Sequence, residues 1–270
     1  MPELPEVETS RRGIEPYCLG KKITGVTVRE SRLRWPVDKA ISQKVTSQTI
    51  SQVARRGKYL LLKAESWIIM IHLGMSGSLR IVSQDEVAGK HDHVDIQLCS
   101  GKCLRFNDPR RFGSILLTKV NEEHSLLAKL GVEPLSKEFN LDYLWQICQK
   151  RSAPIKSVIM NGQVVVGVGN IYAQESLFRV GITPSRAANK ISKKRLASLV
   201  DEIKLVLTEA IEAGGSSLKD FTKADGKPGY FQHTFKVYGK AGEQCPVCST
   251  PLKHTVIAQR ATVYCAKCQK

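Results

Sequence analysis

Four cysteines close to the C-terminus constrain the fold of this chain more than any other feature. Two residues separate Cys245 from Cys248, two separate Cys265 from Cys268, and sixteen lie between the pairs. This spacing is typical of a tetrahedral four-thiolate zinc site, and in so short a segment the bound metal replaces a hydrophobic core. Because four sulfurs leave no open coordination position, we predict one structural Zn²⁺. A redox or disulfide role for these cysteines is the alternative.

The charge of the chain points to a polyanionic partner. Lys and Arg number 41 against 25 Asp and Glu, which gives a net charge of +16 and a pI near 9.6. Nucleic acid fits this balance best, and an anionic membrane surface is the alternative. No apolar run approaches the length of a membrane span, and the N-terminus lacks the features of a signal peptide. In a reducing, intracellular compartment, the scattered Cys18, Cys99, Cys103 and Cys148 are expected to be small buried side chains.

The hydrophobic pattern changes along the chain, which has room for two domains. Short β-type runs alternate with turns at residues 23–28, 58–63, 67–73, 93–98, 103–107 and 114–118. They favour an antiparallel sandwich or barrel. Helical patterns follow at 140–151 and 192–213, the second capped by Ser192 and ended by Gly214-Gly215. We place the domain boundary near residues 121–138 and expect an exposed loop at 217–231.

The N-terminus carries a candidate nucleophile. Removal of the initiator methionine would expose the secondary amine of Pro2 beside the carboxyl group of Glu3. An α-amino group titrates near pH ~8, so a useful fraction is uncharged at neutral pH. Attack on an aldehyde-like carbon would give an iminium, and Glu3 could move the protons. The alternative is that residues 5–8 simply begin a helix, with proline in its first turn and acids at its positive end.

Several loops carry side chains suited to nucleic acid. The run NDPRRFG at 107–113 places two guanidinium groups and Phe112 in a turn, and GMSG at 74–77 presents Met75. Such side chains can wedge into a duplex and contact an orphaned base, although each could instead pack in the core. GVGNIY at 167–172 precedes a predicted helix whose N-terminus favours a phosphate; a plain tight turn is the alternative. Tyr172 occupies the third-glycine position, which excludes the dinucleotide fingerprint.

Three further side chains are candidates by position. Lys58 enters a predicted strand and could point at a site, and His91 could contact a phosphate. Arg260 lies on the hairpin predicted between the two cysteine pairs and could also reach a phosphate. An ordinary solvated position is the alternative for each of them.

The runs PELPEVE at 2–8, HLGMSG at 72–77, DPRRFG at 108–113 and VGVGNIY at 166–172, with the four-cysteine tail, closely resemble the bacterial formamidopyrimidine-DNA glycosylases, which repair 8-oxoguanine. The resemblance spans the whole chain. It implies an α+β multidomain fold with an N-terminal antiparallel β-sandwich (1–130), a helix-two-turn-helix domain (131–232) and a zinc finger (233–270). DNA would lie in the cleft between the halves. It also implies a monomer in the bacterial cytoplasm, associated with the nucleoid and not with a membrane.

The resemblance implies a role for each candidate residue at its matching position. Pro2 would attack C1′ of the damaged nucleotide to form a Schiff base, and Glu3 would move protons. Lys58 would assist β-elimination, and Arg260 would assist δ-elimination. The residues implied to fill the gap left by the flipped nucleotide, here called the gap-filling set, are Met75, Arg110 and Phe112, with Arg110 reading the orphaned cytosine. The implied phosphate contacts are His91, Arg151, Lys156 and Asn170, and the implied lesion-capping loop is 217–230.

We therefore expect a bifunctional DNA glycosylase and AP lyase. It would remove oxidised purines, such as 8-oxoguanine and formamidopyrimidines, opposite cytosine and cut the strand by β,δ-elimination. One alternative is a relative that prefers oxidised pyrimidines, as endonuclease VIII does; the gap-filling set and Leu4-Pro5 argue against it. The other is a non-catalytic zinc-ribbon DNA-binding protein, which would leave Pro2-Glu3 and Lys58 without a purpose.

Overall fold

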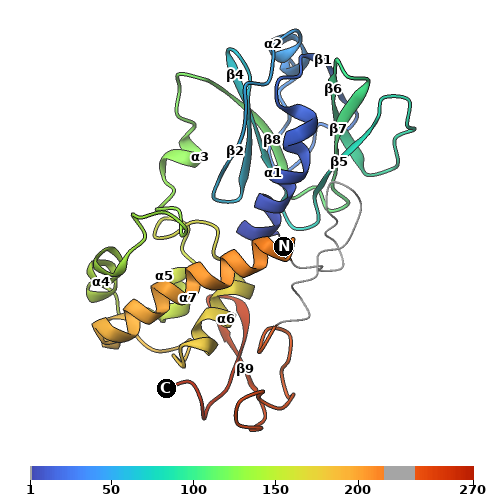
Figure 1. The fold of residues 1–270 in the computed structure, drawn as a ribbon. Coiled ribbons are helices and arrows are strands. Elements are labelled where there is room, and N and C mark those ends of the chain that lie inside the picture. The colour runs from blue at the N-terminus through green and yellow to red at the C-terminus, as the bar shows by residue number, and fades with distance from the viewer. Residues whose placement is uncertain (1, 216–234) are drawn as a thin grey trace. The chain divides into compact units, whose positions relative to one another are not determined.

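Two antiparallel four-stranded sheets and a helix lying on their common core organise the first part of the chain (Figure 1). The structure is a computed structural model that describes residues 2–215 and 235–270. These fall into two units, one comprising residues 2–128 and 213–215 and the other residues 129–212 and 235–270.

The first unit contains three helices and eight strands. Its helices are α1 (Leu4–Cys18), α2 (Ile41–Val45) and α3 (Ser125–Ala128). Its strands are β1 (Ile23–Val28), β2 (Gln52–Arg56), β3 (Tyr59–Lys63), β4 (Trp67–His72), β5 (Ser78–Ser83), β6 (Asp92–Leu98), β7 (Lys102–Asn107) and β8 (Ser114–Lys119). One sheet has the order β1-β6-β7-β5 and the other β2-β3-β4-β8, with every neighbouring pair antiparallel.

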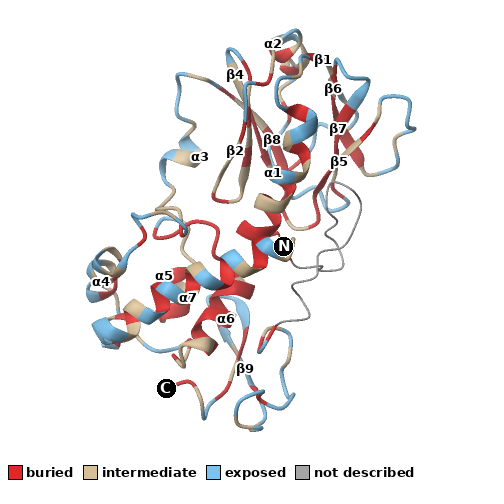
Figure 2. Cartoon of the chain, in the orientation of Figure 1, coloured by how far each residue is buried: buried red, intermediate tan, exposed pale blue. Residues whose placement is uncertain are grey.

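The two sheets share one hydrophobic core, which makes them a sandwich. Ile96 and Leu104 from one sheet and Leu60 and Ile71 from the other belong to a single buried cluster. Helix α1 adds an apolar stripe to the same cluster, with Ile14 fully buried. Figure 2 shows buried residues in red along the strands and along α1. The predicted antiparallel sandwich is therefore confirmed.

The sequence pattern missed two strands and misplaced two residues. β2 (QVARR) and β5 (SLRIVS) are too rich in polar and basic residues to give a clear β signal. Lys58 lies just before β3, in the two-residue turn that follows β2, and not in the strand itself. The expectation of burial holds for Cys18, Cys103 and Cys148 but was wrong for Cys99, which is exposed because it lies in the turn between β6 and β7.

The second unit is helical and ends in a β-hairpin. Its elements are α4 (Leu141–Gln149), α5 (Ile155–Ile159), α6 (Asn170–Arg179), the short 3₁₀ helix η1 (Ala188–Lys190), α7 (Lys193–Glu212), β9 (Lys253–Ile257) and β10 (Arg260–Tyr264). Asn140 caps α4 by accepting a hydrogen bond from Tyr143 N at 3.0 Å. Helix α7 buries the apolar stripe that the sequence predicts, and it packs on α4 and α6. It ends before Gly214, whose φ of +78° suits only glycine well.

Two further expectations concern the 217–231 loop and membrane-spanning segments. The exposed loop expected at 217–231 lies outside the described residues. Among the helices that are described, none has the length and apolarity required to cross a bilayer.

Candidate active site and zinc centre

The N-terminal segment forms the start of α1. Pro2 and Glu3 are both buried, Glu3 with 2% of its surface exposed. The backbone N–H of Glu3 donates to Glu6 Oε2 at 2.8 Å, and the carboxylate of Glu3 accepts from the backbone N–H of Glu6. This reciprocal capping box confirms that the segment begins a helix. It also holds the carboxylate of Glu3, the residue after Pro2, in place. The segment can therefore begin a helix and still carry a candidate nucleophile and a candidate proton-transfer group.

Lys58 lies in the turn between β2 and β3, and β2 is held against α1. Arg55 Nε on β2 donates to Glu8 Oε2 on α1 at 3.2 Å. This ion pair joins β2, the strand that precedes the Lys58 turn, to the helix that follows Pro2-Glu3. The sequence alone did not suggest this connection, since Glu8 and Arg55 are 47 positions apart.

The charge of Lys58 also acts on His72 at the end of β4. Burial, aided by the charges of Lys58 and Arg34, lowers the pKa of His72 to about 4. His72 is therefore neutral at pH 7, and its Nδ1 accepts a hydrogen bond from Gly74 N at 3.0 Å. The ring of Tyr59 lies 4.9 Å from the His72 ring. This neutral imidazole supports the backbone at the start of the turn that carries Met75.

One carboxylate joins the two loops of the gap-filling set. Asp108 is fully buried; its Oδ1 accepts from Ser76 Oγ and its Oδ2 from Gly113 N, both at 2.8 Å. The loops also touch at Gly74, where an added Cβ would lie 2.4 Å from the carbonyl carbon of Phe112. The 72–77 turn and the 108–113 turn therefore form one rigid pair, which the sequence did not predict.

Two of the three side chains of this set are exposed. Phe112 is 46% exposed and Arg110 is also exposed, with the Arg110 guanidinium 5.1 Å from the centre of the Phe112 ring. Met75 is half-buried. Packing in the core, the alternative considered for Phe112, is therefore wrong. A solvent-facing phenylalanine held by a cation–π contact is suited to insertion between bases.

His91 lies beside a polar pocket of the first unit. The pocket has a volume of about 450 Å³, and its lining includes Arg29, Lys90, His91 and Arg111. Arg111 is ion-paired with Glu30 at 3.2 Å. The carboxylates of Glu30 and Asp92 also line the pocket, so basic and acidic side chains meet beside His91.

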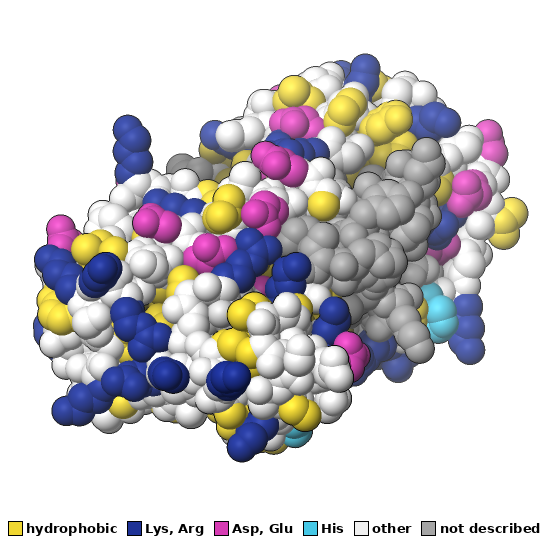
Figure 3. Space-filling model, turned by 60° about the horizontal axis from the view of Figure 1, so that its bottom comes forward, with side chains coloured by type: hydrophobic (Ala, Val, Ile, Leu, Met, Phe, Trp, Pro, Cys, Tyr) yellow, Lys and Arg dark blue, Asp and Glu magenta, His cyan; other side chains and the backbone are white. Residues whose placement is uncertain are grey.

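In the second unit, a buried lysine binds a second candidate, Asn170, and the hairpin residue Thr262. Lys156 is 1% exposed, and its Nζ donates to Asn170 Oδ1 and to Thr262 Oγ1, each at 2.6 Å. Asn170 is the first residue of α6, so the ammonium group lies at a helix N-terminus, where both charge and dipole favour an anion. Arg151 is half-buried just after α4, and Arg260 is exposed at the start of β10. Lys and Arg side chains recur across the face shown in Figure 3.

Sequence reasoning missed two buried polar residues of α6. Gln174 and Glu175 are each 1% exposed and bind the backbone of the C-terminal segment. The Glu175 carboxylate accepts from the N–H groups of Lys236, Val237 and Tyr238 at 2.8, 3.0 and 2.8 Å. The available signal was a polar stretch, Gln174-Glu175-Ser176, between the apolar residues 171–173 and 177–178.

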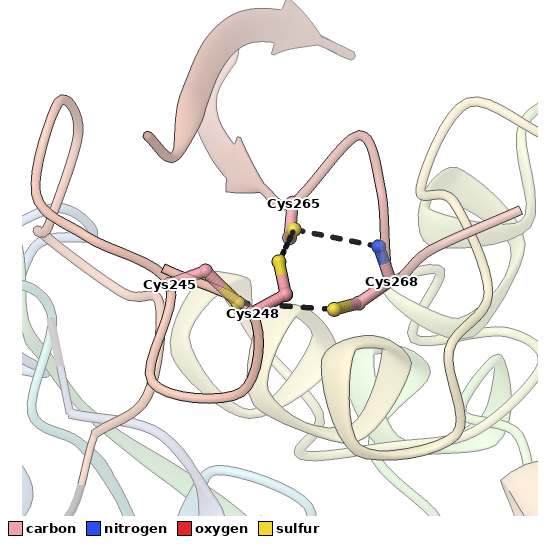
Figure 4. Close-up of side chains that lie close together, drawn as sticks. All are labelled: Cys245, Cys248, Cys265 and Cys268. Carbon is pink, nitrogen blue, oxygen red and sulfur yellow. Dashed lines mark hydrogen bonds between the residues drawn. The ribbon is translucent and has the colours of Figure 1, made fainter. Parts of the chain in front are cut away.

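The four C-terminal cysteines converge on one point (Figure 4). Their sulfur atoms all lie within 4.8 Å of one another, with Cys245 to Cys268 at 3.9 Å and Cys248 to Cys265 at 3.5 Å. A tetrahedron with Zn–S bonds of about 2.3 Å separates its sulfurs by roughly 3.8 Å, so the arrangement fits Zn²⁺. Disulfides, at about 2 Å, do not match. The predicted structural zinc site is thus confirmed in its ligands.

Comparisons with known proteins cover nearly the whole chain. Three family models match: the formamidopyrimidine-DNA glycosylase N-terminal domain over residues 1–115, the formamidopyrimidine-DNA glycosylase H2TH domain over 130–222, and the zinc finger found in FPG and IleRS over 242–270. Among curated relatives, the formamidopyrimidine-DNA glycosylases of Klebsiella pneumoniae and Salmonella arizonae are 54% and 56% identical over 270 residues, covering 100% of both chains in each case.

Solved structures with this fold include proteins bound to damaged DNA. The MutM (Fpg) protein of Thermus thermophilus is 36% identical with a TM-score of 0.89, covering 99% of this chain and 98% of that one. The Lactococcus lactis Fpg in complex with DNA containing an abasic site is 32% identical with a TM-score of 0.91, covering 99% of both chains.

Proposed function

Because the chain belongs to the formamidopyrimidine-DNA glycosylase family, we infer that it is a DNA glycosylase and AP lyase that excises oxidised purines from duplex DNA. The observation that carries this inference is the match over the full length, at 52–56% identity, to curated formamidopyrimidine-DNA glycosylases. The positive charge, the zinc finger and the exposed Arg110 and Phe112 agree with a DNA substrate.

Pro2 is proposed as the nucleophile after removal of the initiator methionine. Its nitrogen bonds to C1′ while the glycosidic bond breaks, and the base departs with the electron pair and gains a proton. The amine loses its own proton, and the C1′–O4′ bond of the sugar then breaks, with O4′ taking the electron pair and a proton, which leaves an iminium between the Pro2 nitrogen and C1′. Loss of a proton from C2′ then expels the 3′ phosphate, and loss of a proton from C4′ expels the 5′ phosphate. Glu3, held by its capping box, is suited to these proton transfers.

The remaining candidates are assigned to DNA contacts and to the elimination steps. Lys58 assists β-elimination and Arg260 assists δ-elimination. Met75, Arg110 and Phe112 fill the gap left by the flipped nucleotide, with Arg110 facing the orphaned cytosine. The proposed phosphate contacts are His91, Arg151, Lys156 and Asn170. The electrostatic field at the start of α6, where Lys156 meets Asn170, supports the last two.

The zinc ion has a structural part in this proposal. The thiolates of Cys245, Cys248, Cys265 and Cys268 hold it, and with all four positions taken it supplies folding free energy to the hairpin and no reaction step. We further propose three functional parts, residues 1–130, 131–232 and 233–270, in a monomer that acts on chromosomal DNA in the cytoplasm. Light scattering of the purified protein would test the monomer.

The preference for purines over pyrimidines is tested with two duplexes. One carries 8-oxoguanine opposite cytosine and the other thymine glycol, and the two cleavage rates are compared under single-turnover conditions. We expect faster cleavage of the 8-oxoguanine duplex. A preference for thymine glycol would assign the chain to pyrimidine repair instead.

Borohydride trapping tests the nucleophile. The Met1-processed, zinc-loaded protein is incubated with the 8-oxoguanine duplex and borohydride, and the cross-linked peptide is mapped. An adduct on Pro2 is expected, and a protein that retains Met1 should bind DNA without forming it. An adduct on Lys58 would reassign the nucleophile, and binding without any adduct would favour a non-catalytic DNA-binding protein.

A further inference from the structure

The hairpin that carries Arg260 is held by a side-chain amide from α6. Gln174 Oε1 accepts from Val263 N at 2.6 Å, and Gln174 Nε2 donates to Ala261 O at 3.2 Å and to Asn170 O at 2.9 Å. Within the described residues β10 pairs only with β9, so these contacts lie on the other edge of β10. The Gln174 amide accepts one hydrogen bond from the backbone of this edge and donates another to it. It thus makes the kind of backbone hydrogen bonds that a neighbouring strand would make.

The backbone carbonyl of Ala261, the residue after Arg260, accepts hydrogen bonds from side chains of two helices. Ala261 O accepts from Gln174 Nε2, from Asn170 Nδ2 at 3.1 Å and from Lys156 Nζ at 3.4 Å. Because the last two donors belong to proposed phosphate contacts, the same hydrogen bonds connect the phosphate-binding residues with the peptide that follows Arg260.

A hydroxyl group extends this connection to Arg260 itself. Thr262 is fully buried; its Oγ1 accepts from Lys156 Nζ at 2.6 Å and donates to Arg260 O at 3.0 Å. Among the described residues, no hydrogen bond or ion pair holds the Arg260 side chain, which is exposed. The backbone of Arg260 is thus fixed while its guanidinium projects outward.

The turn before Arg260 needs such support. Ala258 and Gln259 have φ of +49° and +59°, a left-handed conformation that costs non-glycine residues free energy and persists only when the surroundings enforce it. The contacts of Gln174 and Thr262 lie directly after this turn and supply that constraint.

We propose that Gln174 is a positioning residue that sets the place of Arg260 for δ-elimination by binding the free edge of β10. This rests on the proposed function of Arg260. Gln174 touches neither substrate nor reacting atoms, so its effect should appear in the step that uses Arg260 and not in attack by Pro2.

The test compares Gln174→Met, Ser176→Ala and Arg260→Ala in the zinc-loaded protein. Methionine keeps the length of Gln174 and removes all three hydrogen bonds. Ser176 is the matched control, since it is fully buried on the same helix and, among the described residues, its Oγ bonds only to Tyr172 O in α6, at 2.8 Å. On a duplex with a preformed abasic site we measure the rate of borohydride trapping, the β- and δ-elimination rates, and the zinc content.

We expect Gln174→Met to slow δ-elimination by about tenfold to a hundredfold, with trapping within about twofold of wild type. Ser176→Ala should leave the δ/β ratio unchanged, and adding Gln174→Met to Arg260→Ala should have little further effect. Loss of δ-elimination in Arg260→Ala but not in Gln174→Met would overturn this inference alone. An unchanged rate in Arg260→Ala would overturn the role of Arg260, and this inference with it.

A measurement on the wild-type protein covers the case in which Gln174→Met does not fold. The Val263 amide, bonded to Gln174 Oε1, should exchange its hydrogen slowly despite lying on the edge of a two-stranded sheet. Rapid exchange of this amide in the zinc-loaded protein would refute the positioning contact.

Discussion

Replacement of Asp108 by alanine should uncouple the two loops of the gap-filling set. The substitution leaves the Ser76 hydroxyl and the Gly113 N–H without their acceptor, and both groups are buried. A buried polar group left unsatisfied costs about 1–3 kcal/mol, so the two together cost about 2–6 kcal/mol. Because a hydroxyl can rotate toward another acceptor while a backbone N–H cannot, we expect a loss of about 3 kcal/mol.

Hydrogen exchange and urea unfolding measure this loss where it occurs. Peptides covering residues 72–78 and 106–114 should exchange faster in Asp108→Ala, and the urea midpoint of the first unit should fall. Asp108→Asn should cost about half as much, since its Oδ1 still accepts from Ser76 Oγ while its Nδ2 faces Gly113 N. Excision of 8-oxoguanine should also slow, because Met75 and Phe112 then lie on independently moving loops.

Glu122→Ala is the control for loss of an acidic side chain. Glu122 pairs with Lys119 at 3.2 Å, but both side chains are more than half exposed, so its loss should change stability by less than about 0.5 kcal/mol. If Asp108→Ala were as stable as this control, the two loops would not be coupled through Asp108, and the reasoning from buried hydrogen bonds would be wrong.

Three further predictions concern pH, metal and the gap-filling set. Since the pKa of His72, about 4, lies below its value of about 6.5 in an unfolded chain, neutral His72 stabilises the fold above pH 6.5. That contribution, at most about 3 kcal/mol, should disappear as the pH falls toward 4, and His72→Gln should flatten the pH dependence of urea unfolding. Removal of zinc should unfold the 245–268 segment and abolish DNA binding in a mobility-shift assay; intact binding after verified metal loss would contradict this. Phe112→Ala should change the unfolding free energy by less than about 1 kcal/mol while weakening excision about tenfold, because Phe112 is 46% exposed; equal losses in both would indicate a core role.

The parts of the fold that were predictable from sequence are those with a local signal. The stripe of α7 repeats with helical period and ends at paired glycines, and the strands from Trp67 and Ser114 are runs of apolar residues. The sequence pattern did not predict β2 because its residues are mostly polar. It is a strand only because β3 pairs with it and α1 packs against it. Its stability comes from partners that are distant in the sequence, so no window of residues could reveal it.

The candidate site divides in the same way. The cysteine spacing fully specified the zinc ligands, because both pairs are local and the metal needs only their convergence. The gap-filling set was proposed from its motifs, but the motif around Asp108 gave no sign that this carboxylate binds the 72–77 turn. That role depends on register between β5 and β7, which pairs Ser78 with Asn107 and so brings the two turns together.

Lys156 shows why a side chain's type does not determine its environment. A lysine in a basic chain is expected in solvent, yet this one is 1% exposed. Burial of an ammonium group is tolerated only where acceptors surround it, and those of Lys156 come from Asn170 and from Ala261 and Thr262 on the zinc-finger hairpin. The hairpin in turn requires four metal ligands to form. Removal of zinc should therefore take the acceptors on Ala261 and Thr262 away from Lys156, so a structural metal with no reaction step should still affect the site where a phosphate is proposed to bind.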